Sequence, residues 1–133
     1  MPDAPTAGPA YTVLVADDNE VAQRLCRRVL EKAGHKVLVA SDGQEAVNLA
    51  LASRPDMILM DVSMPSMDGL EAMRLIKDQI PGMPVVVASA HSMGNDRERF
   101  LAAGADAVLS KPFKLAELTE IVDRLAGGRT QTP

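Results

Sequence analysis

Carboxylate, hydroxyl and ammonium side chains stand at the ends of short apolar segments of the chain. Asp17 and Asp18 follow the first of these segments, and Asp61 follows the third. Ser89 ends the fourth segment, and Lys111 comes soon after the fifth. If the five residues meet in the folded protein, they provide oxygen ligands for a metal ion, a nucleophile, and donors for an anion.

The chemistry of such a cluster follows from its charges. Three neighbouring carboxylates raise one another's pKa values unless a cation sits among them. Mg²⁺ or Mn²⁺ suits the site because these ions take oxygen ligands and leave positions for phosphoryl oxygens. Phosphoryl transfer depends mainly on positioning and charge stabilisation. We therefore expect an ionised Asp61 to attack phosphorus while Lys111, Ser89 and the metal stabilise the phosphoryl oxygens.

Each of these residues also has an ordinary structural explanation when it is taken alone. Asp17 and Asp18 are suited to capping the N-terminus of a helix. Asp61 is suited to opening the turn that follows it. Ser89 fits a buried hydroxyl bonded to the backbone, and Lys111 fits a solvated surface charge. The presence of all five at corresponding places in the chain favours the functional interpretation.

The elements that must position these residues are short strands alternating with helices, a pattern typical of a parallel sheet. Strands are predicted at Thr12–Ala16, Lys36–Ala40, Met57–Met60, Val85–Ser89 and Ala107–Leu109. Each interval between strands is long enough for one crossover helix and two loops. A doubly wound sheet carries its functional groups beyond the carboxyl ends of its strands, where all the polar candidates fall.

Five helices complete this pattern. They are predicted at Glu20–Ala33, about 43–53, about 70–79, roughly 96–103, and from Leu115 to a glycine pair at 127–128. Gly34 is expected to end the first helix. Ser41 and Gln44 have the spacing of a capping box at the start of the second helix. Gly127 and Gly128 are expected to end the fifth.

Length and composition favour one compact domain. The chain has 133 residues, is 47% hydrophobic and carries a net charge of −4, without the basic patch of a nucleic-acid-binding protein. Its apolar runs are too short to span a membrane and no secretory leader is visible, so we expect a cytoplasmic protein. Cys26 is interpreted as a small buried hydrophobe. We expect flexible tails at 1–10 and 127–133 around a domain at 11–126.

Four segments, taken in order, resemble the hallmarks of response-regulator receiver domains of two-component and phosphorelay systems. They are VLVADDNE, MILMDVSMPSMDGLEAMR, VVVASAHS and LSKPF. The resemblance extends from about Tyr11 to Leu125. It implies a flavodoxin-like, doubly wound (βα)5 fold with a parallel five-stranded sheet in the order 2-1-3-4-5.

The resemblance also implies roles for individual residues. Asp61 would be the phosphoacceptor. Asp18 and Asp61 would bind Mg²⁺ directly, Asp17 would bind it through a water molecule, and the backbone carbonyl of Ser63 would complete the protein ligands.

The other matching positions flank the phosphoryl group in receivers. Ser89 resembles the switch hydroxyl, and Ala90 resembles the small residue that leaves room for the phosphoryl group. Lys111 matches the family's lysine, and its bond to Pro112 would then be cis.

One position departs from the family pattern. Receivers usually carry Tyr or Phe three residues before the lysine, and this chain has Val108 there. Phe113 lies on the wrong side of the lysine to replace that ring, so the usual inward turn of an aromatic side chain is in doubt. His91 has two interpretations, a residue that controls water near the phosphoryl group and a solvated loop histidine.

The favoured function is a signalling switch, either free-standing or part of a hybrid histidine kinase, and not a turnover enzyme. Its partners would be a sensor histidine kinase or a histidine phosphotransfer protein, and a downstream protein. One alternative is an aspartyl-phosphate phosphatase similar to the haloacid dehalogenase family, which has a second Asp where this chain has Ser63. Another is a receiver-like interaction module that is never phosphorylated, for which loss of an acidic residue or of the lysine is the expected sign.

Overall fold

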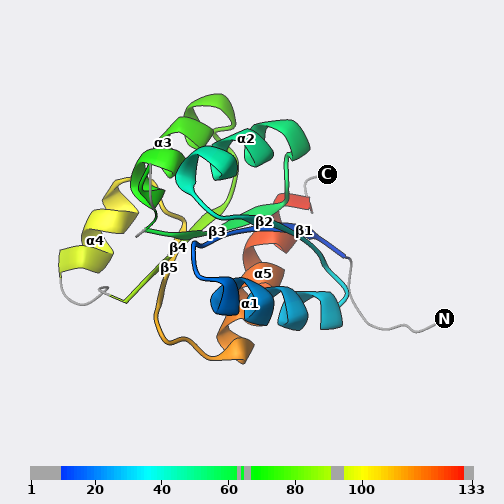
Figure 1. Ribbon diagram of the computed structural model, residues 1–133. Coiled ribbons are helices and arrows are strands. Elements are labelled where there is room, and N and C mark those ends of the chain that lie inside the picture. Colours follow the sequence, from blue (N-terminus) through cyan, green and yellow to red (C-terminus); the bar gives the residue numbers. More distant parts are fainter. Residues whose placement is uncertain (1–9, 63, 65–66, 91–94, 131–133) are drawn as a thin grey trace.

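The computed structural model describes residues 10–62, 64, 67–90 and 95–130, in which five strands alternate with five helices (Figure 1). The strands are β1 (Thr12–Ala16), β2 (Lys36–Ala40), β3 (Met57–Asp61), β4 (Val85–Ser89) and β5 (Ala107–Ser110). The helices are α1 (Glu20–Lys32), α2 (Gly43–Ser53), α3 (Gly69–Gln79), α4 (Asn95–Ala102) and α5 (Leu115–Thr130). The strands pair in parallel in the order β2-β1-β3-β4-β5, which confirms the predicted flavodoxin-like fold.

Helices cover both faces of the sheet. Figure 1 shows α1 and α5 on one face and α2, α3 and α4 on the other. Along β1, Val13 and Val15 belong to the core beneath α1 and α5, whereas Leu14 and Ala16 belong to the core beneath α2 and α3. This alternation arises because successive side chains of a strand point to opposite faces. Burial of both faces explains why the strands are almost continuously apolar.

Side-chain caps start three helices at the carboxyl edge of the sheet. In each case the cap oxygen accepts a hydrogen bond from the backbone N–H three residues later. The caps are Asn19 of α1, Asp42 of α2 and Asp68 of α3. These bonds satisfy N–H groups that the first helical turn leaves without an intrahelical partner, and thereby fix where each strand gives way to its helix.

The capping box predicted from Ser41 and Gln44 is wrong by one residue. Asp42 is the cap, and its Oδ1 accepts from the Glu45 backbone N–H at 2.8 Å. Glu45 in turn accepts a hydrogen bond from the Ser41 backbone N–H, also at 2.8 Å. The predicted pair, Ser41 and Gln44, and the observed pair, Asp42 and Glu45, each have a short acceptor side chain followed three residues later by a longer polar one. The observed register places one carboxylate at the N-cap and one in the first turn, where the helix dipole stabilises negative charge.

The structure tests the prediction that glycines end the first and fifth helices. Gly34 has a φ of +99° just after α1, as expected for a residue that stops a helix. The predicted end of the fifth helix is wrong, because α5 continues through Gly127 and Gly128 to Thr130. Glycine disfavours a helix by only about 1 kcal/mol relative to alanine and does not forbid helical dihedral angles. The turn before these glycines packs into the core through Ala126, which is fully buried.

The proposed division at 11–126 stays a prediction, since residues 1–9 and 131–133 lie outside the described part of the chain. Among the helices described, none is both long and apolar enough to cross a membrane.

Tyr11 and His35 form a buried pair at the edge of the sheet opposite the polar residues. The Tyr11 backbone N–H donates to His35 Nδ1 at 3.1 Å, and the two rings stack with their centroids 5.4 Å apart. Burial lowers the pKa of His35, while the charge of nearby Asp123 acts in the opposite direction and is the weaker cause. The imidazole is therefore neutral in the folded protein at neutral pH, with Nδ1 free of a proton.

This pair predicts a pH-dependent stability. Because the pKa of His35 is lower in the folded state, the unfolded chain takes up the proton first as the pH falls below about 6.5. The free energy of unfolding should then decrease. His35→Asn keeps an acceptor near the Tyr11 N–H but does not titrate, so it should lose less stability between about pH 7.5 and about pH 5.5. Urea unfolding at the two pH values measures this, and equal losses in both proteins would contradict the assignment.

Candidate functional site

The carboxyl ends of four parallel strands bring the predicted residues to one edge of the sheet. Asp17 follows β1, and Asp61 and Ser89 are the last residues of β3 and β4. Lys111 follows β5 directly, and its backbone N–H donates to the Ser89 carbonyl at 2.8 Å. Because the strands run in the same direction, residues far apart in the sequence become neighbours here.

Three carboxylates form the centre of the site. One oxygen from each of Asp17, Asp18 and Asp61 lies within 4.8 Å of the other two. Asp17 and Asp61 are buried and Asp18 is exposed. The three oxygens are hard ligands on a partly open edge, and their negative charges repel one another. A hard divalent cation therefore fits the chemistry of this donor set.

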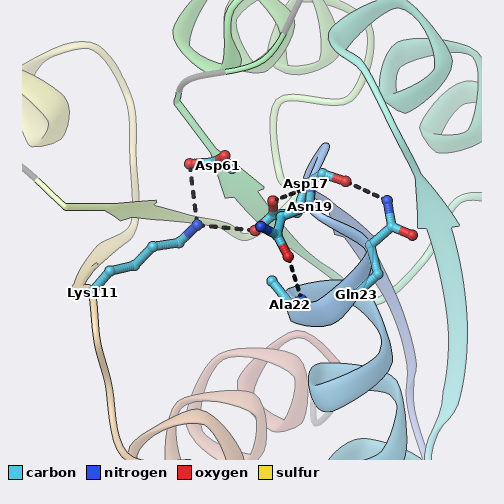
Figure 2. A network of polar contacts seen from close by, with 6 residues as sticks. All are labelled: Asp17, Asn19, Ala22, Gln23, Asp61 and Lys111. Atoms are coloured by element: carbon cyan, nitrogen blue, oxygen red, sulfur yellow. Dashed lines mark hydrogen bonds and ion pairs between the residues drawn. The ribbon is translucent and has the colours of Figure 1, made fainter.

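Lys111 provides positive charge inside the cluster. Its Nζ lies 3.0 Å from Asp17 Oδ2 and 3.5 Å from Asp61 Oδ1 (Figure 2). Burial alone lowers the pKa of Lys111. The hydrogen bond and charge of Asp17, together with Asp61, outweigh this effect and raise the pKa above its ordinary value. Lys111 is thus a cation at neutral pH. Its two ion pairs and the partial burial of its side chain rule out the interpretation of it as a solvated surface charge.

Asp17 is held by contacts on both its backbone and its side chain (Figure 2). Its backbone N–H donates to the Ala40 carbonyl at 3.0 Å, and its Oδ1 accepts from the Asn19 backbone N–H at 2.9 Å. Its own carbonyl accepts a hydrogen bond from Gln23 Nε2. Since Asn19 is the cap of α1, the interpretation of Asp17 or Asp18 as that cap is wrong.

Gly69 lets the segment after β3 fold back onto the site. Its backbone N–H donates to the Val62 carbonyl at 3.2 Å. A Cβ atom built on Gly69 would collide with the backbone carbonyl of Asp61. Only glycine fits without a shift of the backbone that carries Asp61. The dipeptide Asp68-Gly69 is typical of a turn, but the close approach of Gly69 to Asp61 is visible only in three dimensions.

Several sequence predictions at the site have separate outcomes. Ser63 and His91 lie outside the described residues, so the metal ligand and the water-control role assigned to them stay predictions. Ser89 is almost fully buried at the same edge, and Ala90 is exposed. The cis bond between Lys111 and Pro112 is confirmed.

The departure at Val108 is also clear in the structure. Val108 is buried in β5, and its carbonyl accepts a hydrogen bond from Arg97 Nη1 of α4 at 3.3 Å. Phe100 is the buried residue of α4, the helix that the sequence predicted at roughly 96–103.

An apolar cavity of about 470 Å³ adjoins the carboxylates, between α1 and the segment that follows β5. Its lining includes Asp17, Asp61 and Lys111 at one side. Three of its lining residues are exposed large hydrophobics: Val21 (71%), Leu25 (48%) and Leu115 (43%). The spacing of apolar residues along α1 does not reveal this surface, because it does not say how much of each side chain a neighbouring segment covers.

Cys26 lies in the wall of the same cavity and is buried, as predicted. Burial raises the pKa of its thiol to about 11, with the charge of Asp17 adding to the effect. Cys26 is therefore a neutral packing residue at physiological pH.

Comparison with known proteins gives concordant matches. The family model for the response regulator receiver domain matches residues 13–123. The polar-differentiation response regulator DivK of Brucella anthropi is 34% identical over 118 residues, which cover 87% of this chain and 96% of DivK.

Solved structures show the same similarity. The receiver domain of Francisella response regulator 1452 has a TM-score of 0.86 and 33% identity, covering 91% of this chain and 99% of that one. The receiver domain of the sensor histidine kinase PA1611 from Pseudomonas aeruginosa has a TM-score of 0.82 and 37% identity, covering 90% and 99%. That structure holds a magnesium ion in its active site cleft.

The close approach of Gly69 to the Asp61 backbone predicts that a methyl group added at position 69 destabilises the fold. Gly69→Ala should lower the free energy of unfolding by about 1–3 kcal/mol, because the Asp61 backbone must move to admit the new atom. Gly82→Ala is the matched control, since a Cβ there meets nothing within 4 Å. Its effect should stay within about 0.5 kcal/mol. Urea unfolding of both variants checks this, and an equal effect of the two substitutions would disprove it.

Proposed function

Because the chain belongs to the response regulator receiver domain family, we propose that Asp61 accepts a phosphoryl group from a phosphohistidine donor. The family acts in phosphorelay signal transduction of two-component systems. The observation that carries the assignment to Asp61 is the contact of Lys111 with Asp17 and Asp61, at 3.0 and 3.5 Å, beside the exposed carboxylate of Asp18. Transfer to an aspartate needs this combination of a nucleophilic carboxylate, metal ligands and a fixed cation.

We assign Mg²⁺ to the three carboxylates, with Asp18 and Asp61 as direct ligands and Asp17 as a ligand through water. The carbonyl of Ser63 completes the proposed protein ligands, and Mn²⁺ should replace Mg²⁺. Support comes from the mutual distances of the three carboxylates and from the magnesium ion in the PA1611 receiver domain. When bound, the ion supplies charge neutralisation for the carboxylates and the phosphoryl oxygens.

In the proposed transfer, a carboxylate oxygen of Asp61 forms a bond to phosphorus while the bond from phosphorus to the donor imidazole nitrogen breaks. The bonding pair stays with that nitrogen, and the ring, protonated on its other nitrogen, leaves as neutral imidazole. Lys111 moves its ammonium from Asp17 and Asp61 to a phosphoryl oxygen, and the Ser89 hydroxyl donates to another. Later attack of water releases inorganic phosphate and restores the Asp61 carboxylate.

We propose that this cycle makes the protein a switch and not an enzyme that turns over an external substrate. The phosphatase alternative is disfavoured because Ser63 stands where those enzymes need a second Asp. The unphosphorylated module is disfavoured because all three carboxylates and Lys111 are retained. Oxygens of the three carboxylates lie within 4.8 Å of one another, and Lys111 contacts Asp17 and Asp61. The conformational response should reach α4 through the Arg97 contact with β5.

The phosphoryl donor in this proposal is a sensor histidine kinase or a histidine phosphotransfer protein in the cytoplasm, and a downstream protein receives the signal. The donor must bring its histidine to Asp61. The exposed apolar residues Val21, Leu25 and Leu115 line the cavity that opens beside Asp61. A partner that covers these side chains gains hydrophobic contact at the place where the transfer occurs.

Acetyl phosphate should label the protein once, at Asp61, and only when Mg²⁺ or Mn²⁺ is present. Asp61→Asn should abolish the label because an amide does not act as the nucleophile. Asp78→Asn removes an exposed carboxylate of α3 and should be labelled like the wild type. Intact-mass and peptide mass spectrometry measure this. Undiminished labelling of Asp61→Asn would refute the assignment.

Leu25→Asp should slow transfer from a phosphohistidine protein by about tenfold or more, because it places a charge in the apolar contact surface. Labelling by acetyl phosphate, which needs no docking surface, should change much less. Leu101→Asp is the matched control, since Leu101 is similarly exposed (41%) but lies on α4. Transfer is timed with a donor that phosphorylates the wild type. Equal slowing by both substitutions would place the docking surface elsewhere.

A further inference from the structure

The side chain of Gln23 extends from α1 back to the end of β1. It is not one of the charged groups of the site. Its Nε2 donates to the backbone carbonyl of Asp17 and lies 3.2 Å from Ser41 Oγ (Figure 2 shows the contact with Asp17). Ser41 follows β2, and its backbone N–H donates to Glu45 in the first turn of α2. The amide of Gln23 thus joins three elements at the edge of the sheet that carries the site.

The carbonyl that Gln23 holds belongs to the peptide between Asp17 and Asp18. The paired residues of β1 end at Ala16 in both ladders, so this peptide lies just beyond the sheet. Rotation of the peptide plane would swing Asp18 relative to Asp17. Asp17 has further contacts through its N–H and its carboxylate, but the side chain of Asp18 is exposed. The direction of Asp18 therefore depends on the backbone that Gln23 fixes.

We infer that Gln23 is a positioning residue for the metal site. Its side-chain amide fixes the Asp17–Asp18 peptide and so holds the two carboxylates in the arrangement that binds the cation. This inference rests on the proposed function, in which these carboxylates bind Mg²⁺. Groups that orient metal ligands without touching the metal commonly change metal affinity by about 10–100-fold when they are replaced.

Gln23→Met tests the inference, because methionine has a similar length and no hydrogen-bond donor. Mg²⁺ alone is titrated into the full chain by isothermal titration calorimetry, and the Kd of Gln23→Met should rise by about tenfold. Gln44→Met is the matched control, since the Gln44 amide contacts Asn48 within α2 and lies outside the site. Its Kd should stay within about twofold of the wild-type value.

The free energy of unfolding, measured without Mg²⁺, distinguishes a positioning role of Gln23 from a purely structural one. A purely structural role of Gln23 would lower that free energy and leave the Kd of the folded protein unchanged. A Kd for Gln23→Met within about twofold of wild type therefore overturns the inference. If Gln23→Met does not fold, Gln23→Glu replaces it. Its added negative charge would by itself strengthen Mg²⁺ binding, so weaker binding supports the inference and equal or stronger binding overturns it.

Failure of this inference is distinguishable from failure of the proposed function. With saturating Mg²⁺, acetyl phosphate should label Asp61 in Gln23→Met as it does in the wild type. An unchanged Kd with normal labelling rejects only the role of Gln23. Absence of labelling in the wild type rejects the phosphoacceptor assignment itself, whatever the Mg²⁺ affinities are.

Discussion

The mutual repulsion of three carboxylates is the constraint on which the rest of the site depends. Two unit charges about 4 Å apart interact by roughly 4 kcal/mol at an effective dielectric constant of about 20. The fold brings Asp17, Asp18 and Asp61 together because parallel strands end at the same edge of the sheet, and it buries two of the three. Lys111 offsets part of the repulsion within the chain. One ammonium does not balance three carboxylates, so the site stays attractive to a divalent cation and to the positive groups of a donor protein.

The backbone around the carboxylates is held by groups that take no part in the chemistry. Asn19 caps α1, donates its N–H to Asp17 and thereby turns the chain sharply from β1 into the helix. Gln23 holds the peptide between Asp17 and Asp18, and Gly69 permits a close approach to the Asp61 carbonyl. These contacts fix the carboxylates in a geometry that their own charges disfavour. The rigid sheet and its helix caps are thus the means by which the fold keeps a repulsive cluster assembled.

In the proposed function, the polar site and the apolar cavity beside it serve complementary purposes. The carboxylates bind a metal ion and accept a phosphoryl group, and this chemistry does not distinguish one donor protein from another. Val21, Leu25 and Leu115 instead present an exposed apolar surface, which only a partner of complementary shape covers well. Their exposure has an energetic cost in water, which a partner removes when it covers them. The proposed function therefore combines a general reaction and a route to partner specificity at the same edge of the sheet.

The sequence by itself determined the order of elements, the parallel sheet and the candidate residues at the strand ends. These follow from local signals: apolar runs, helical periodicity and the polar residue after each strand. The capping register at Ser41 and the end of α5 were predicted wrongly, because neighbouring residues offer nearly equivalent caps and glycine only weakly opposes a helix. The contacts of Lys111, the collision that reserves position 69 for glycine, the exposure of Leu25 and the reach of Gln23 were decided by tertiary structure alone. Each depends on the distance between segments far apart along the chain or on what a neighbouring element leaves uncovered, and no local pattern of residues encodes either quantity.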